Sequence, residues 1–116
     1  MVALSYEDFL AEIQALLGEQ VSVVFVLELA GHQRPVGMFS GELRLGQEVD
    51  LRQLFAQWRG GVDFPSGEAI LFFVGDEMNS CFVVRRDDFK HGSRDDNGLL
   101  AYRTGKLSIG ITRADG

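Results

Sequence analysis

The stretch Gln20-Val-Ser-Val-Val-Phe-Val-Leu-Glu-Leu-Ala30 has the composition of a long β-strand. β-branched and aromatic residues dominate it, and its odd positions from Val21 to Leu29 are all apolar, which is typical of a strand with one face on the core. Val24 and Val26 make the opposite face partly apolar as well. A strand of this kind is covered on both faces. We therefore expect the rest of a sheet or barrel on one side and a helix or a partner subunit on the other.

A second strand is predicted directly after the first, over Val36 to Leu45. The polar stretch Gly31-His32-Gln33-Arg34-Pro35 separates the two and has the residue types of a connector, so the pair reads as a hairpin. Gly37 and Gly41 fall inside the second strand. A glycine there indicates a bulge, a bend or a close approach of another backbone.

Two helices are predicted on either side of this hairpin. Over residues 5–17, apolar residues recur at helical spacing, Ser5 is a suitable N-cap and Gly18 a suitable stop. The second helix is short, over residues 50–59, with Asp50 as N-cap and Gly60-Gly61 as the stop. Its apolar positions are Leu51, Leu54, Phe55 and Trp58.

The rest of the chain is predicted to be mostly strand. Residues 69–74 and 81–85 form a second hairpin, the polar residues 86–98 form a mobile surface loop, and 99–102 and 107–112 are strands around a turn at 104–106. The predicted fold is α+β, with an N-terminal amphipathic helix on a bent antiparallel sheet or small barrel of about five or six strands. Residues 1–116 are expected to form a single domain.

Charge and cysteine content restrict the classes of partner and compartment. The net charge of −6 repels phosphate polymers and anionic lipids, so neither nucleic acid nor a membrane is expected as a partner. Cys81 is the only cysteine, which rules out an intrachain disulfide and suits a reducing compartment. Without a basic, apolar leader or a spanning apolar run, the protein is expected to be soluble and cytoplasmic.

No motif predicts a cofactor or a metal. Thr104-Gly105-Lys106-Leu107 lacks the spacing and the hydroxyl residue of a phosphate-binding loop. Residues 93–98 imitate the start of a calcium loop, but Thr104 stands where the bidentate acid is needed. An Asp-Asn-Gly turn is favoured there, with a metal loop at Asp95 and Asp96 as the alternative. Cys81 lies in an apolar strand and is expected to be a buried, inert thiol.

The stretch 85–98 has the chemical variety that a site requires, because it combines an imidazole with carboxylates and cations. Mixed charge runs of this kind usually form a solvated surface. An arginine there could instead bind a carboxylate or phosphate, oriented by the neighbouring acids. The candidate binding residues are Arg85, Arg86, Asp88, His91, Arg94 and Asp95.

The order of elements resembles that of the Sm-like RNA-binding ring proteins, in which a helix precedes bent strands. Gly41-Glu42-Leu43 is similar to the Gly-x-Leu of their first motif, and Asp76-Glu77-Met78-Asn79 is similar to their Asp…Met-Asn segment. Here a predicted helix and a loop separate these pieces, and the Arg/Lys-Gly pair of the family has no clear counterpart. The resemblance is therefore one of topology, and it implies a small barrel that binds RNA.

Three functions remain open. The preferred one is a non-catalytic interaction module that forms homo-oligomers or binds another protein, since residues 21–29 are apolar on both faces and Phe72-Phe73 are adjacent. The second is a nucleic-acid-binding small barrel. The third is a small ligand-binding or enzymatic domain that uses the 85–98 loop. The shortage of convergent ionisable groups favours the non-catalytic function.

Overall fold

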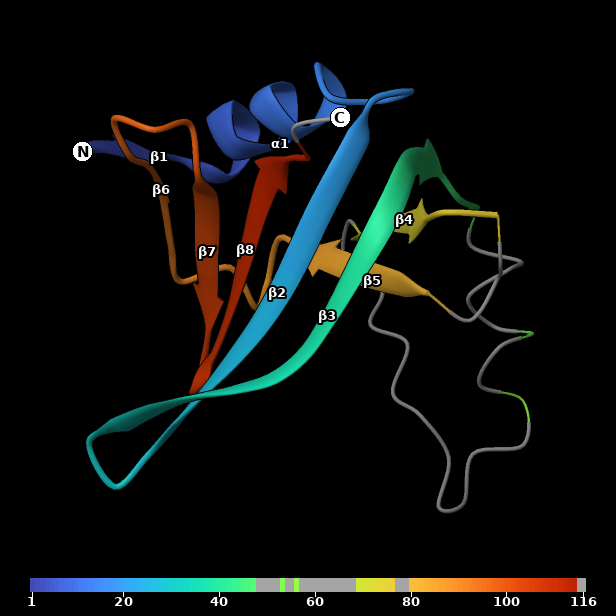
Figure 1. The fold of residues 1–116 in the computed structure, drawn as a ribbon. Helices are drawn as coiled ribbons and strands as arrows, with labels where there is room; N and C mark the ends of the chain where they lie inside the picture. Colours follow the sequence, from blue (N-terminus) through green and yellow to red (C-terminus); the bar gives the residue numbers. More distant parts are fainter. Residues whose placement is uncertain (48–52, 54–55, 57–68, 77–79, 115–116) are drawn as a thin grey trace.

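A computed structural model describes residues 1–47, 53, 56, 69–76 and 80–114. Within them, eight strands form one antiparallel sheet in the order β1-β6-β7-β8-β2-β3-β4-β5, and the sheet curls into a half-barrel with one helix, α1 (Figure 1). The elements are β1 (Val2–Leu4), α1 (Tyr6–Gln14), β2 (Gln20–Leu29), β3 (His32–Leu45), β4 (Ala69–Val74), β5 (Cys81–Arg85), β6 (His91–Arg94), β7 (Leu100–Thr104) and β8 (Leu107–Arg113). The antiparallel, bent sheet with an N-terminal helix was predicted, but the strand count was too low. The predicted helix at 50–59 lies almost entirely outside the described residues.

The helix begins as predicted and ends earlier than predicted. Ser5 is its N-cap, and the Ser5 hydroxyl accepts a hydrogen bond of 3.1 Å from the amide of Asp8. The α-helical part stops at Gln14, and turns lead from there to Gly18, which has a φ of +86°. A positive φ suits glycine at the end of a helix. Tyr6, Phe9, Leu10 and Ile13 are the buried face of the helix.

The core fills the concave side of the half-barrel. Phe9 and Ile13 of α1 pack in one cluster with Val21 and Val23 of β2, and all four are fully buried. The face of β2 that carries the odd-numbered residues therefore points into the core that α1 shares. The opposite face, at Val24, does not, and the residue paired with Val24, Met38, is 66% exposed.

Closure of the half-barrel involves a hydrogen bond between distant strands. The hydroxyl of Tyr102 on β7 donates a bond of 2.8 Å to the carbonyl of Val83 on β5. Phe9, Phe89 and Tyr102 pack around it with ring centroids 5.0 to 5.6 Å apart. Strands near opposite ends of the hydrogen-bonded order are thus joined through the interior, and this contact holds the sheet in its curled shape.

The hairpin of β2 and β3 is longer than predicted, because residues 32–35 belong to β3 and not to a connector. Its turn consists of Ala30 and Gly31, with φ of 52° and 80°, as in the two-residue turns that match the twist of a hairpin. The glycines in β3 have the roles predicted for them. Gly37 adjoins a shift in register, and a Cβ at Gly41 would lie 2.7 Å from the Cα of Gly75.

The predicted mobile loop at 86–98 was wrong in its centre. His91–Arg94 form β6, which pairs with β1 on one side and with β7 on the other. The backbone hydrogen bonds of these polar residues are made with two neighbouring strands, so the polarity of their side chains did not indicate a loop. The structure also contains β1, which was not predicted.

No helix in the described part of the chain is long and apolar enough to span a membrane.

Candidate functional site

The predicted site residues Arg85, Arg86 and Asp88 lie at the corner after β5. An Arg85 nitrogen lies 3.9 Å from an Asp88 oxygen. Arg86 forms an ion pair of 2.5 Å with Glu7, and its guanidinium lies 4.4 Å from the centre of the Tyr6 ring. The hydrogen bond from Arg86 lowers the pKa of the Glu7 carboxyl. This corner thus attaches the first turn of α1 to the sheet.

The remaining predicted residues, His91, Arg94 and Asp95, belong to a different part of the surface. His91 is exposed on β6 opposite Arg103, and Arg94 forms an ion pair with Glu12 of α1.

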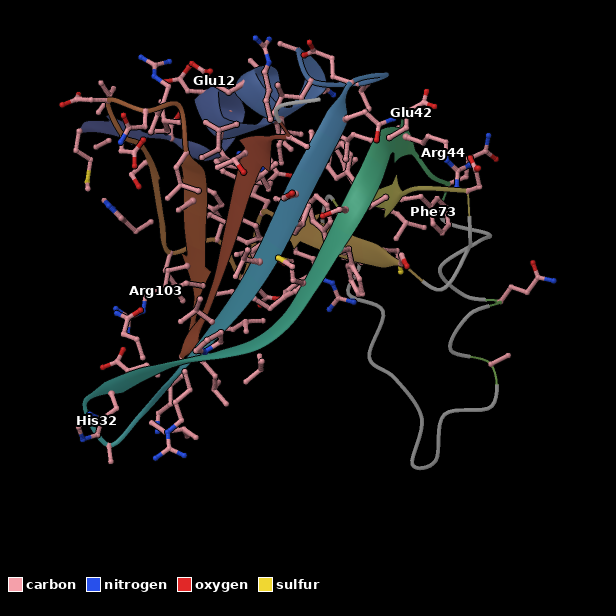
Figure 2. The ribbon with its side chains drawn as sticks, in the orientation of Figure 1. Glu12, His32, Glu42, Arg44, Phe73 and Arg103 are labelled. Atoms are coloured by element: carbon pink, nitrogen blue, oxygen red, sulfur yellow. The ribbon has the colours of Figure 1, made fainter. Side chains whose placement is uncertain are left out.

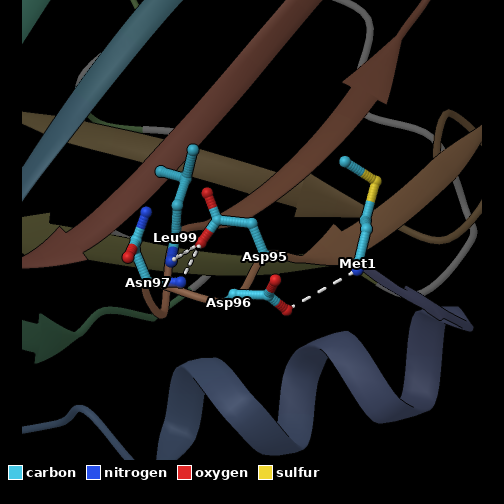
Figure 3. A network of polar contacts seen from close by, with 5 residues as sticks. All are labelled: Met1, Asp95, Asp96, Asn97 and Leu99. Carbon is cyan, nitrogen blue, oxygen red and sulfur yellow. Dashed lines mark hydrogen bonds and ion pairs between the residues drawn. The ribbon is translucent and has the colours of Figure 1, made fainter.

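Asp95 stabilises the turn between β6 and β7. One of its carboxylate oxygens accepts hydrogen bonds of 2.9 Å from the amides of Asn97 and Leu99 (Figure 3). Asp96 lies 3.7 Å from the N-terminal amine. The favoured Asp-Asn-Gly turn is therefore confirmed. The described residues contain no group of three or more His, Cys, Asp or Glu side chains that could hold a metal ion.

A cleft of about 600 Å³ lies between α1 and the ends of β6, β7 and β8. Its lining is mixed, with apolar, amide, hydroxyl and charged groups from Glu12, Ala15, Leu16, Arg94, Asn97, Gly98, Leu100, Thr112 and Arg113. Of the six predicted site residues, only Arg94 lines this cleft. Its two arginines are each paired with an acid, Arg94 with Glu12 and Arg113 with Glu19 at 3.0 Å. A bound anion would have to compete with these carboxylates.

No activated nucleophile is found among the described side chains with a perturbed pKa. Cys81 is half-buried, and burial raises the pKa of its thiol. Burial also raises the pKa of the Tyr102 hydroxyl, which donates a hydrogen bond to the carbonyl of Val83. Both groups stay protonated near neutral pH, where a nucleophile needs to be ionised. The raised pKa agrees with the inert thiol predicted for Cys81, although this side chain is only half-buried and not fully buried as predicted.

The most unusual surface lies on the β2–β3 hairpin. We call residues 28–38 the arm, because this part of the hairpin projects away from the rest of the sheet (Figure 1). Every residue from Leu29 to Met38 is exposed. The apolar ones include Leu29 at 40%, Val36 at 58% and Met38 at 66% exposure. Val36 and Met38 lie two residues apart on β3, and exposed apolar side chains this close together indicate a contact surface.

The outer edge of β3 is also open along the arm. β3 has fourteen residues, but β4 pairs only with Leu43, Arg44 and Leu45. Within the described part of the chain, no strand pairs with the outer edge of residues 32–40. An unpaired strand edge presents free backbone donors and acceptors to a second chain.

The base of the hairpin carries two charged side chains, Arg44 and Glu42, that were not among the predicted site residues. Arg44 donates a hydrogen bond of 2.7 Å to the carbonyl of Gly75, and its guanidinium lies 5.4 Å from the centre of the Phe73 ring. Glu42 is exposed two residues earlier on the same strand (Figure 2). At the far end, His32 marks the tip, and Arg103 of β7 pairs with Glu28.

The arm was not predicted from the sequence as a contact surface. Val36 and Met38 lie in the predicted second strand, and neither was named as a contact residue. Conversely, Phe72 and Phe73 were taken as support for an apolar surface, yet they are 0% and 4% exposed. The mismatch in length between β3 and β4 leaves the outer edge of the arm open, and it depends on pairing that no single stretch of sequence shows.

The chain matched no protein-family model, no curated protein and no solved structure.

Proposed function

We propose that this chain is a non-catalytic interaction module that self-associates through its arm. The observation that carries this proposal is the arm itself, which combines exposed Val36 and Met38 with an open strand edge. Burying such apolar side chains contributes about 25 cal/mol for each Å² removed from water. In an isolated arm this apolar area stays in water. A contact between two arms would bury it and so lower the free energy.

The arrangement of charges supports a contact function over nucleic-acid binding. Five arginines are each held by an acid of the same chain: Arg85, Arg86, Arg94, Arg103 and Arg113. Recognition of phosphate polymers requires a basic stripe that is free to displace counterions. The net charge of −6 acts in the same direction.

The test is the oligomeric state as a function of protein concentration. Sedimentation equilibrium of the wild-type chain is expected to show a reversible increase in mass, which the double variant V36S/M38S loses. Leu17→Ser is the matched control, because Leu17 is an exposed apolar residue outside the arm, at 36% exposure. A wild-type chain that stays monomeric at millimolar concentration would refute self-association.

A second function, the binding of a small carboxylate ligand, is supported by the cleft beside α1. Its volume suits a small molecule, and Arg94 and Arg113 could exchange their internal acids for a ligand carboxylate. Titration with citrate, followed by the NMR signals of the arginine side chains, tests this function. Saturable shifts that Arg113→Gln abolishes would support it, and unchanged spectra at millimolar citrate would contradict it.

A further inference from the structure

The open edge of β3 has a definite hydrogen-bonding register. The amide of Gly75 donates 2.8 Å to the carbonyl of Glu42, so the backbone of Glu42 points away from β2. Leu43 points toward β2, because its amide donates 3.0 Å to the carbonyl of Glu19. Residues 37–42 pair with β2 without interruption, and backbone direction alternates along a strand. Met38 and Ser40 therefore present their amides and carbonyls to the open edge.

We propose that the occupant of this edge is a second copy of the chain, paired antiparallel about a twofold axis at Met38. This inference rests on the proposed self-association and specifies its geometry. In such a pair, Met38 faces Met38 of the other copy, and Ser40 faces Val36. Two exposed apolar side chains from each copy, Met38 and Val36, then cover one another.

Charge complementarity favours a second copy over an unrelated strand. Arg34 and Glu42 lie four residues on either side of Met38, and both are exposed. Neither forms an ion pair with another residue in the described ranges. Gly75 already occupies the backbone position opposite Glu42, so the two copies part beyond Val36 and only side chains can meet there. The twofold axis directs the Arg34 side chain of each copy toward the Glu42 side chain of the other, so the same pair forms twice. A self-complementary patch of this kind is what a twofold interface requires.

The register shift beside Gly37 moves Arg34 by about one position relative to Glu42 of the other copy. Arginine is long enough to reach a diagonal neighbour across two strands. Pro35 has no amide to donate, so the backbone ladder stops beyond Val36. The contact pairs residues 36–40 of one copy with the same residues of the other, and a twofold contact of this kind closes at two chains.

The first experiment removes one backbone donor. Met38→Pro deletes an amide that points away from β2, so it leaves the β2–β3 hydrogen bonds intact. By sedimentation equilibrium we expect its dissociation constant to rise at least about tenfold over that of the wild type. Circular dichroism verifies that the variant is folded. If it is not, the charge variants below decide the question.

The second experiment exchanges charges. Arg34→Glu and Glu42→Arg each place like charges together in their own dimer, so each variant alone is expected to be more monomeric than the wild type. In a mixed dimer, one chain has an acid at both positions 34 and 42, and the other chain has an arginine at both. Each contact between the chains then joins opposite charges again. A mixed dimer is therefore expected, measured by native mass spectrometry of isotopically labelled chains.

The outcomes separate this inference from the function on which it rests. A wild-type dimer that persists in all three variants overturns the β3 edge and leaves self-association intact. Failure of the mixture to restore dimers overturns the pairing of Arg34 with Glu42, and hence the twofold axis at Met38. A wild type that is monomeric throughout overturns both. Restoration in the mixture, with loss in Met38→Pro, supports the proposed interface.

Discussion

The two ends of the β2–β3 hairpin differ in the burial of their side chains and in the pairing of their backbone. At its base, Val21 and Val23 are fully buried in the core cluster, and Arg113, opposite Val21 on β8, is paired with Glu19. On the arm, Val36 and Met38 are exposed, and the backbone edge has no partner strand among the described residues. The same strand pattern thus serves packing at one end and leaves a contact surface at the other. What differs is the covering of each face of the sheet. Val23 points into the core, whereas Met38, which pairs with Val24 on the opposite face, is not covered by any described element.

The largest expected effect comes from the buried end. Phe9→Ala removes a fully buried ring that contacts Phe89 and Tyr102, and we expect it to lower the free energy of unfolding by about 3 to 5 kcal/mol. Urea denaturation measures this change. A loss under about 1 kcal/mol would show that the aromatic cluster does not hold the helix on the sheet.

A matched pair of substitutions tests the comparison most directly. Val23→Ala leaves a cavity in the core, with an expected loss of about 2 kcal/mol. Val36→Ala is on the same hairpin but exposed, so its effect on unfolding is expected to stay within about 0.5 kcal/mol. Both are measured by urea denaturation at a protein concentration low enough for the monomer. Equal losses would refute the distinction between base and arm.

Closure across the half-barrel is tested by Tyr102→Phe. The variant keeps the ring in the aromatic cluster but loses the hydrogen bond to the carbonyl of Val83. Because this leaves the carbonyl without that donor, we expect a loss of about 1 kcal/mol. Amide exchange of β5 should increase more than that of β8. Equal changes in the two strands would mean that the bond does not tie β5 to β7.

The turn of the arm contains the one non-glycine residue with positive φ in the described ranges, Ala30 at 52°. An L-residue other than glycine or asparagine is strained in this conformation by about 1 kcal/mol. Ala30→Gly is therefore expected to stabilise the hairpin by a few tenths to about 1 kcal/mol, after the entropy that glycine costs in the unfolded chain. Thermal denaturation measures it, and a clear loss of stability would show that the turn is not strained.

The smallest effect concerns the exposed pair of Glu7 and Arg86. Their hydrogen bond lowers the pKa of Glu7 in the folded state, so the contribution of Glu7 to stability is present above the ordinary value of 4.5 and is lost as pH falls through the lowered pKa. Glu7→Gln should be slightly less stable than the wild type at neutral pH. The difference should disappear in acid, as measured by denaturation at a series of pH values.

Much of the fold could be predicted from local patterns. Period-two alternation predicted β2 and β8, apolar runs between turn residues predicted β4 and β5, and helical spacing with Ser5 predicted the start of α1. Glycines predicted the close approach at Gly41. The polar composition of residues 86–98 predicted a loop. His91–Arg94 nevertheless form a strand, because their backbone pairs with β1 on one side and with β7 on the other. The candidate site residues were placed in one group because they are near in sequence, and the fold separates them along the length of α1.

Local patterns were enough to predict α1, β2, β4, β5 and β8 and the apolar side of each, because these properties depend on residues a few positions apart. The strands β1 and β6, the burial of Phe72 and Phe73 and the exposure of Val36 and Met38 depend instead on long-range packing. Burial of a side chain depends on what packs on its face of the sheet, and those packing partners come from distant parts of the chain. The outer edge of the arm is open for a separate reason, because β4 pairs with only three residues of a strand of fourteen.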